Sequence, residues 1–101
     1  NMLATDGIIH ILTYVDTKNK IIVKEPNIIT KGFVNTKVGE EGLEQIKENV
    51  IKVINASFAK RKTMDEFEAA IENDIKRLLY RLTKKNTTIL PIVIDLKNIK
   101  Y

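Results

Sequence analysis

The hydrophobic pattern of this chain changes its period once, near Glu40, and that change restricts the possible folds more than any other feature. Before Glu40 the apolar residues form short runs rich in β-branched side chains, which is the pattern of strands. After Glu40 they recur at steps of three and four residues, the spacing of one face of an amphipathic helix. A chain with both periods in this order is expected to be an α+β domain in which helices cover a sheet.

Two or three strands are predicted ahead of the helices. Residues 7–15 form a long β-prone run, residues 16–20 are polar and turn-like, and residues 21–23 follow as a second strand. Because so short a loop joins antiparallel neighbours, we expect a hairpin. Pro26 interrupts the second strand, and residues 28–34 either continue it or form a short strand of their own.

Two helices and a last strand complete the predicted order. The first helix covers about residues 40–59, and the second runs from a capping box at Thr63 to about residue 84. Residues 88–96 form the last strand, and residues 97–101 form a tail. The predicted core stripes are Leu43, Ile46, Val50, Val53, Ile54 and Phe58 in the first helix and Phe67, Ile71, Ile75, Leu78 and Leu82 in the second.

These elements predict one domain over residues 1–101, because a chain of 101 residues is too short for two hydrophobic cores. The predicted architecture is a small, mostly antiparallel sheet of three to four strands in the order β-β-(β)-α-α-β. The short connection between the helices favours two antiparallel helices packed on one face of that sheet. One helix on each face is the alternative.

The composition excludes several classes of protein. Hydrophobic residues make up 44% and charged residues 30% of the chain, as in folded globular proteins rather than disordered ones. No apolar run approaches the ~18 residues of a membrane span, so no membrane partner is expected. The absence of cysteine excludes disulfides and thiolate metal sites, and a cytoplasmic location is the expectation.

The first strand is apolar on both of its faces. Side chains alternate along a strand, so one face carries Ile8, His10, Leu12 and Tyr14, and the other carries Ile9, Ile11, Thr13 and Val15. If both helices cover one face, the other must be buried against another protein surface. We expect Ile9, Ile11 and Val15 to form that interface, with a second copy of the chain or a larger parent protein as the partner.

Residue types that carry catalysis are sparse. The only histidine is His10, within a strand, and no histidine follows Ser57 in helical register, so neither a metal cluster nor a serine triad is predicted. Five cations gather late in the second helix: Lys76, Arg77, Arg81, Lys84 and Lys85. Arg81, Lys84 and Lys85 are candidate contacts to RNA phosphates, and the alternative is that cations at a helix C-terminus only complement the helix dipole.

One short segment carries a resemblance to a known family. Residues 25–34 read EPNIITKGFV, which resembles a stretch in the C-terminal domain of bacterial ribonuclease J, a metallo-β-lactamase/β-CASP nuclease. Residues 6–8 resemble the start of that domain, and residues 83–85 and 89–93 resemble its end. The family-matching structural residues are Pro26, Gly32, Phe33 and Pro91.

The resemblance implies a function outside catalysis. In that family the C-terminal domain takes part in assembling the dimeric or tetrameric enzyme, and two divalent metal ions, expected to be zinc, belong to the catalytic portion. The implied role here is therefore a non-catalytic domain of an RNA-processing or RNA-degrading hydrolase, with no metal or cofactor in this chain. An autonomous RNA-binding module that uses the basic end of the second helix is the alternative.

Overall fold

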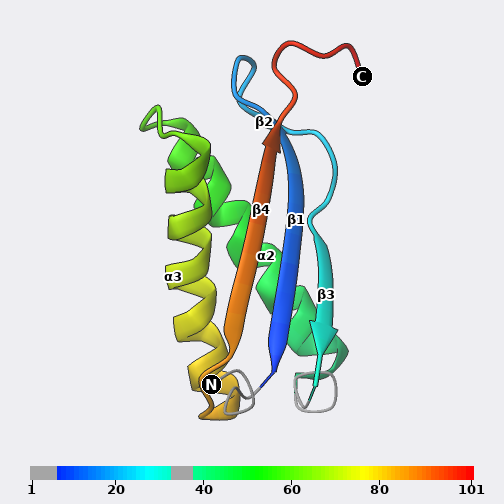
Figure 1. Ribbon diagram of the computed structural model, residues 1–101, viewed down its shortest axis with the longest axis vertical. Coiled ribbons are helices and arrows are strands. Elements are labelled where there is room, and N and C mark those ends of the chain that lie inside the picture. The colour runs from blue at the N-terminus through cyan, green and yellow to red at the C-terminus, as the bar shows by residue number, and fades with distance from the viewer. Residues whose placement is uncertain (1–6, 33–37) are drawn as a thin grey trace.

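The computed structural model describes residues 7–32 and 38–101, and its elements follow the predicted order (Figure 1). The elements are β1 (Ile8–Asp16), β2 (Ile21–Ile22), β3 (Asn27–Lys31), α2 (Gly39–Phe58), α3 (Met64–Thr83) and β4 (Thr88–Asp95). The third strand is thus separate from the second, which was one of the two alternatives. The prediction of an α+β domain with this order of elements is confirmed.

β1 is the central strand of the sheet. Along one side β1 pairs antiparallel with two strands, one after the other. Its first part pairs with β3 (Ile9 with Thr30), and its end pairs with β2 (Val15 with Ile22). Along the other side it pairs parallel with β4 over its length, for example Ile9 with Ile89. The sheet is therefore mixed, and the sequence had left the position and direction of its last strand open.

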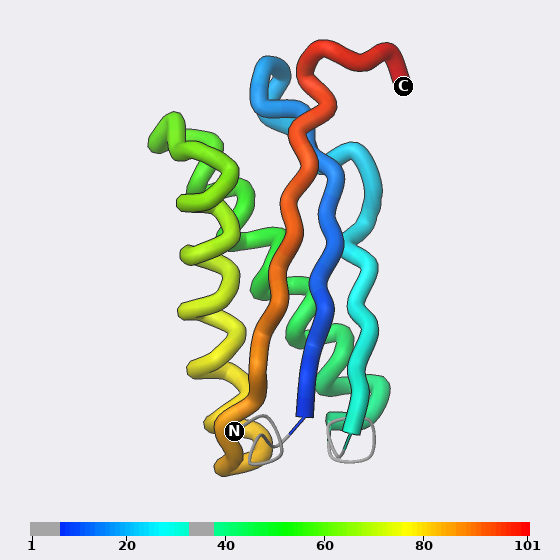
Figure 2. Tube along the Cα trace, viewed as in Figure 1, coloured from blue at the N-terminus to red at the C-terminus, as the bar shows by residue number. Residues whose placement is uncertain are grey.

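Both helices pack on the same face of the sheet, as predicted (Figures 1 and 2). They run in opposite directions, with α2 crossing behind the strands and α3 beside β4. Their apolar stripes and one face of the sheet form the core, where the rings of Phe58 and Phe67 meet edge to face at 5.6 Å. The core residues are Ile9, Ile11, Val15, Ile46, Val50, Ile54, Phe58, Phe67, Ile71, Ile75, Leu78, Leu79, Ile89 and Val93.

The sequence-based interface assignment was on the wrong face. Ile9, Ile11 and Val15 are at most 1% exposed and point toward the helices, so they are core residues rather than interface residues. Both faces of β1 are apolar, and strand periodicity alone does not say which face the helices cover. His10 and Tyr14 could have indicated which face of β1 is turned away from the helices, because side chains with polar tips tolerate water better than the isoleucines on the opposite face.

The start and the stripe of α3 show how local chemistry positions this helix. The Glu66 backbone N–H donates to Thr63 Oγ1 at 3.2 Å, and the Thr63 N–H donates to Glu66 Oε1 at 2.8 Å, which confirms the predicted capping box.

In the core stripe of α3, Leu79 is fully buried, whereas Leu82 is 41% exposed. The predicted stripe was therefore wrong at Leu82, because the helix turns that position away from the core near its end.

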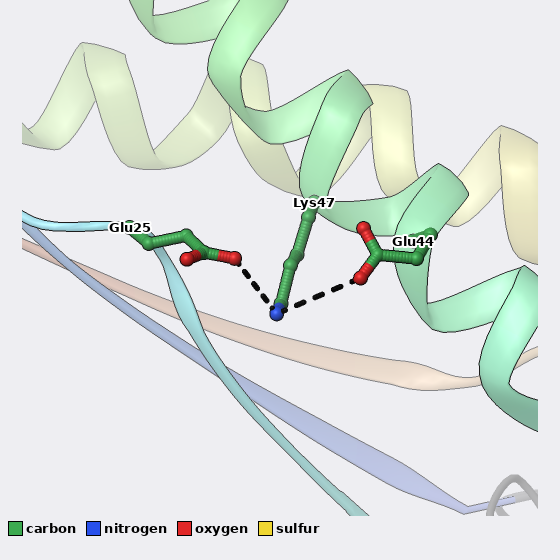
Figure 3. Close-up of polar contacts among 3 residues, drawn as sticks. All are labelled: Glu25, Glu44 and Lys47. Atoms are coloured by element: carbon green, nitrogen blue, oxygen red, sulfur yellow. Dashed lines mark hydrogen bonds and ion pairs between the residues drawn. The ribbon is translucent and has the colours of Figure 1, made fainter.

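The turn before β3 is fixed to α2 by an ion pair. Lys47 Nζ on α2 lies 2.9 Å from Glu25 Oε1 and 4.0 Å from Glu44 Oε1 (Figure 3). The hydrogen bond to Glu25 and the charge of that carboxylate raise the pKa of the Lys47 ammonium group. Pro26 follows directly and is buried. Residues 25–27 therefore fix the connection between β2 and β3 to α2.

Candidate functional site

The face of the sheet that lies opposite the helices is apolar and uncovered by any described element (Figure 1). We call it the outer sheet face and define it by Ile29, Leu90, Ile92 and Ile94, which are exposed, and by Ile8, His10, Leu12 and Tyr14, which are half-buried. Large apolar side chains that are scattered singly over a surface are ordinary, but a contiguous group is not.

The register of the strands makes these side chains contiguous. Leu12 lies directly beside Ile92, and Tyr14 lies beside Ile94. His10 has Ile29 on one side and Leu90 on the other. Neighbours in register have Cβ atoms about 5 Å apart, so the side chains form one continuous apolar surface across three strands.

The free edge of β4 is closed to strand pairing at its centre. The Thr88 N–H donates to the carbonyl of Gly7, directly before β1, at 3.0 Å, and the Leu96 N–H donates to the carbonyl of Val15 at 2.7 Å. By alternation the N–H positions of residues 91 and 93 therefore point outward. Position 91 is a proline and has no N–H, and the Val93 N–H donates to Glu68 Oε2 on α3 at 2.9 Å. A further strand could not bond to these groups, which is a common protection of sheet edges.

The C-terminal segment is hydrogen-bonded to the last residue of β1. The Tyr101 hydroxyl donates to Asp16 Oδ2 at 2.7 Å, and the Asn19 side-chain amide donates to the same oxygen at 2.8 Å. These two hydrogen bonds, with Tyr101 the larger influence, hold the pKa of the Asp16 carboxyl below its ordinary value. The next residue, Thr17, is bound to the end of β4, since its hydroxyl donates to Asp95 Oδ2 at 2.6 Å.

A second surface feature lies on the solvent side of α3. Six exposed residues line a groove of about 490 Å³, which we call the Tyr80 groove. They are Asn73, Lys76, Arg77, Tyr80, Arg81 and Asn86. This lining combines cations, side-chain amides and one aromatic ring, and it shares no residue with the outer sheet face.

The predicted RNA contacts are only partly brought together. Arg81 lines the Tyr80 groove, and Lys84 ends α3 in the left-handed conformation with its Nζ 5.8 Å from the centroid of the Tyr80 ring. Lys85 lies outside the groove, where its N–H donates to Thr83 Oγ1. Sequence reasoning missed Asn73 and Asn86 as lining residues, because isolated asparagines carry no signal until the helix places them beside the cations.

The family-matching residues lie at structural positions. Gly32 has φ +79° directly after β3, and Pro91 lies at the edge of β4. Phe33 is outside the described residues. Within residues 7–32 and 38–101, no group of three metal-ligating side chains comes together, and no helix is long and apolar enough to span a membrane.

Comparison with known proteins identifies the family. The ribonuclease J C-terminal domain model matches residues 1–96. Ribonuclease J 2 of Staphylococcus epidermidis is 31% identical over 97 residues, and ribonuclease J 2 of Staphylococcus aureus is 30% identical over 97 residues. Each match covers 95% of this chain and 17% of the relative, so the chain spans about one sixth of the length of these proteins.

Proposed function

Because this chain belongs to the ribonuclease J C-terminal domain family, we propose that it is the non-catalytic assembly domain of a metal-dependent ribonuclease and that it self-associates through the outer sheet face. The catalytic metal ions of such an enzyme, and its β-lactamase and β-CASP regions, would lie outside this chain. The observation that carries the proposal is the contiguous row of exposed apolar side chains on the outer sheet face.

The charge of the outer sheet face supports a second copy as the partner. Lys31 is paired with Ile8 and therefore lies on this face, at its rim, whereas the eight apolar and aromatic positions that form its centre include no acid, lysine or arginine. Two copies related by a two-fold axis bring the same residues together, so a charged face would repel itself. The uncharged centre of this face avoids that repulsion.

The size of the face indicates a weak contact. The three strands β1, β3 and β4 have nine, five and eight residues, and at about 3.3 Å per residue and about 4.8 Å between strands they cover roughly 350 Å². A standard interface buries about 800 Å² on each partner. We therefore expect a reversible dimer whose population rises with protein concentration, strengthened in a longer protein by contacts elsewhere.

Sedimentation equilibrium from about 5 µM to about 1 mM tests the proposal. The expected result is a monomer–dimer equilibrium within this range. Ile92→Glu should weaken the dimer at least about tenfold, because it places a charge at the centre of the apolar surface. Ile92 is 49% exposed, so the variant should keep the thermal stability of the wild type to within a few degrees.

Two further variants serve as controls. Ile99→Glu changes an isoleucine that is 57% exposed but lies outside the outer sheet face, and it should leave the dimer intact. Ile11→Glu introduces a charge into the core and should unfold the domain. A strict monomer at every concentration would overturn self-association, and so would a dimer that Ile92→Glu leaves unchanged. Docking of the face onto the catalytic portion of a longer enzyme would produce the strict monomer.

A further inference from the structure

The Tyr80 groove carries a second inference, independent of the assembly proposal because it lies on α3 rather than on the sheet. Its residues are exposed and turned away from the core stripe of the helix, so core packing does not explain their presence. The groove is shallow and open to solvent, which suits one unit of a polymer lying across the surface rather than an enclosed small molecule.

The charge of the groove exceeds what the helix dipole accounts for. Favourable interactions between cations and the dipole fall off within the last turn. Arg81 lies in that turn of α3, but Lys76 and Arg77 lie one to two turns earlier. The dipole therefore accounts for the end of the basic cluster but not for Lys76 and Arg77.

Most of this charge is available to a ligand. Arg77 Nη2 lies 3.6 Å from Asp74 Oδ1, and Asp74 is held in turn by a 3.0 Å hydrogen bond from Asn49 on α2. No other described carboxylate lies within ion-pair distance of the groove cations. Lys76 and Arg81 thus face solvent with their full charge beside the ring of Tyr80.

The aromatic ring and the amides select among anionic ligands. Tyr80 is 49% exposed, so half of a large side chain remains open to a flat partner. Bases of single-stranded nucleic acid stack on such rings, while arginine and lysine contact the neighbouring phosphates. Asn73 and Asn86 add both donors and acceptors, which suit the edges of a base.

We propose that the Tyr80 groove binds single-stranded RNA, with one base stacked on Tyr80 and the adjacent phosphates held by Lys76, Arg77 and Arg81. Lys84 lies near the ring without lining the groove, and it would support the orientation of Tyr80 from the helix end. A duplex keeps its bases stacked inside, so it should bind through charge alone and more weakly than a single strand.

Fluorescence anisotropy with a labelled ten-nucleotide oligouridine tests the proposal on the 101-residue chain. At about 50 mM salt the wild type should bind the single strand more tightly than a ten-base-pair RNA duplex. Tyr80→Leu keeps helix propensity and should weaken binding of the single strand about 5- to 150-fold, with the salt slope unchanged. Replacing Lys76, Arg77 and Arg81 with Gln together should reduce that slope by about 2.

Lys52→Gln, an exposed lysine on α2, is the matched control and should bind like the wild type. Circular dichroism should show that each variant remains folded. Three outcomes would overturn the proposal: no binding of oligouridine at about 50 mM salt, wild-type affinity in the folded Tyr80→Leu variant, or equal binding of a ten-residue polyglutamate peptide. The last result would indicate an acidic protein partner instead.

Discussion

Gly32 ends β3 in a backbone conformation that residues with a side chain rarely adopt. Its φ is +79°, and a Cβ atom built there would lie 3.2 Å from the Cα of Gly7. Two separate costs would therefore follow from any substitution, the left-handed backbone and the close approach between the end of β3 and the start of β1.

These two costs can be measured separately. Gly39 has φ +69°, but a Cβ atom there would meet no atom of the described residues within 4 Å. Gly39→Ala should therefore cost only the backbone strain, about 1 kcal/mol, while Gly32→Ala should cost about 2 kcal/mol or more. Urea unfolding of both variants provides the comparison. Equal losses would show that the contact with Gly7 relaxes at no cost.

The outer edge of β4 is hydrogen-bonded to a carboxylate from α3, that of Glu68. Glu68→Ala should lower the free energy of unfolding by about 1–3 kcal/mol, because it leaves the Val93 N–H without its charged acceptor. The Val93 amide should also exchange with solvent faster than in the wild type. Native-state hydrogen exchange measures this directly. Glu72→Ala, one turn further along α3, is the control, and a Val93 amide that stays equally protected in Glu68→Ala would contradict the assignment.

The elements themselves were largely predictable, whereas their contacts were not. The helical period of α2 and the Thr63 capping box predicted those elements because both signals are local in sequence. Leu82 was assigned to the core since it fits the period of α3, but the position of the helix end relative to the sheet decides its burial. The parallel pairing of β4 depends on contacts between distant residues, and no local pattern encodes it.

At the scale of the whole molecule, one hydrogen bond joins the last residue, Tyr101, to Asp16 at the end of the central strand. Tyr101→Phe should lower the melting temperature near neutral pH by removing that bond. Because the pKa of Asp16 is lowered in the folded state, its contribution to stability is present above the unfolded value of about 3.9 and is lost as the pH falls through the folded value. The difference between wild type and variant should therefore shrink in acid.

The same bond should weaken in strong base. The hydrogen bond to Asp16 raises the pKa of the Tyr101 hydroxyl, so its contribution is present below the unfolded value of about 10 and is lost as the pH rises through the folded value. Thermal melts across the pH range test both limits. Tyr80→Phe, at an exposed tyrosine outside this contact, is the control. A wild-type melting temperature for Tyr101→Phe at neutral pH would show that the bond adds no stability.

The candidate surfaces were less predictable than the fold. The sequence predicted an apolar interface and a basic cluster, but the interface residues that it named on β1 are buried in the core, and it did not foresee that Asn73 and Asn86 lie beside the cations. Sequence spacing describes one element at a time. The covered face of a sheet, or a groove completed by a residue beyond the helix end, results from packing between elements.

The parallel pairing of β1 with β4 has a consequence for synthesis of the chain. Within this domain β1 is synthesised before both helices, whereas β4, the strand that completes one of its sides, is synthesised after them. At about 5–20 residues per second, the central strand waits roughly 4–15 s with that side unpaired. During this interval the isoleucines of β1 are available to other nascent chains, so the domain should depend on chaperones most while its own translation is unfinished.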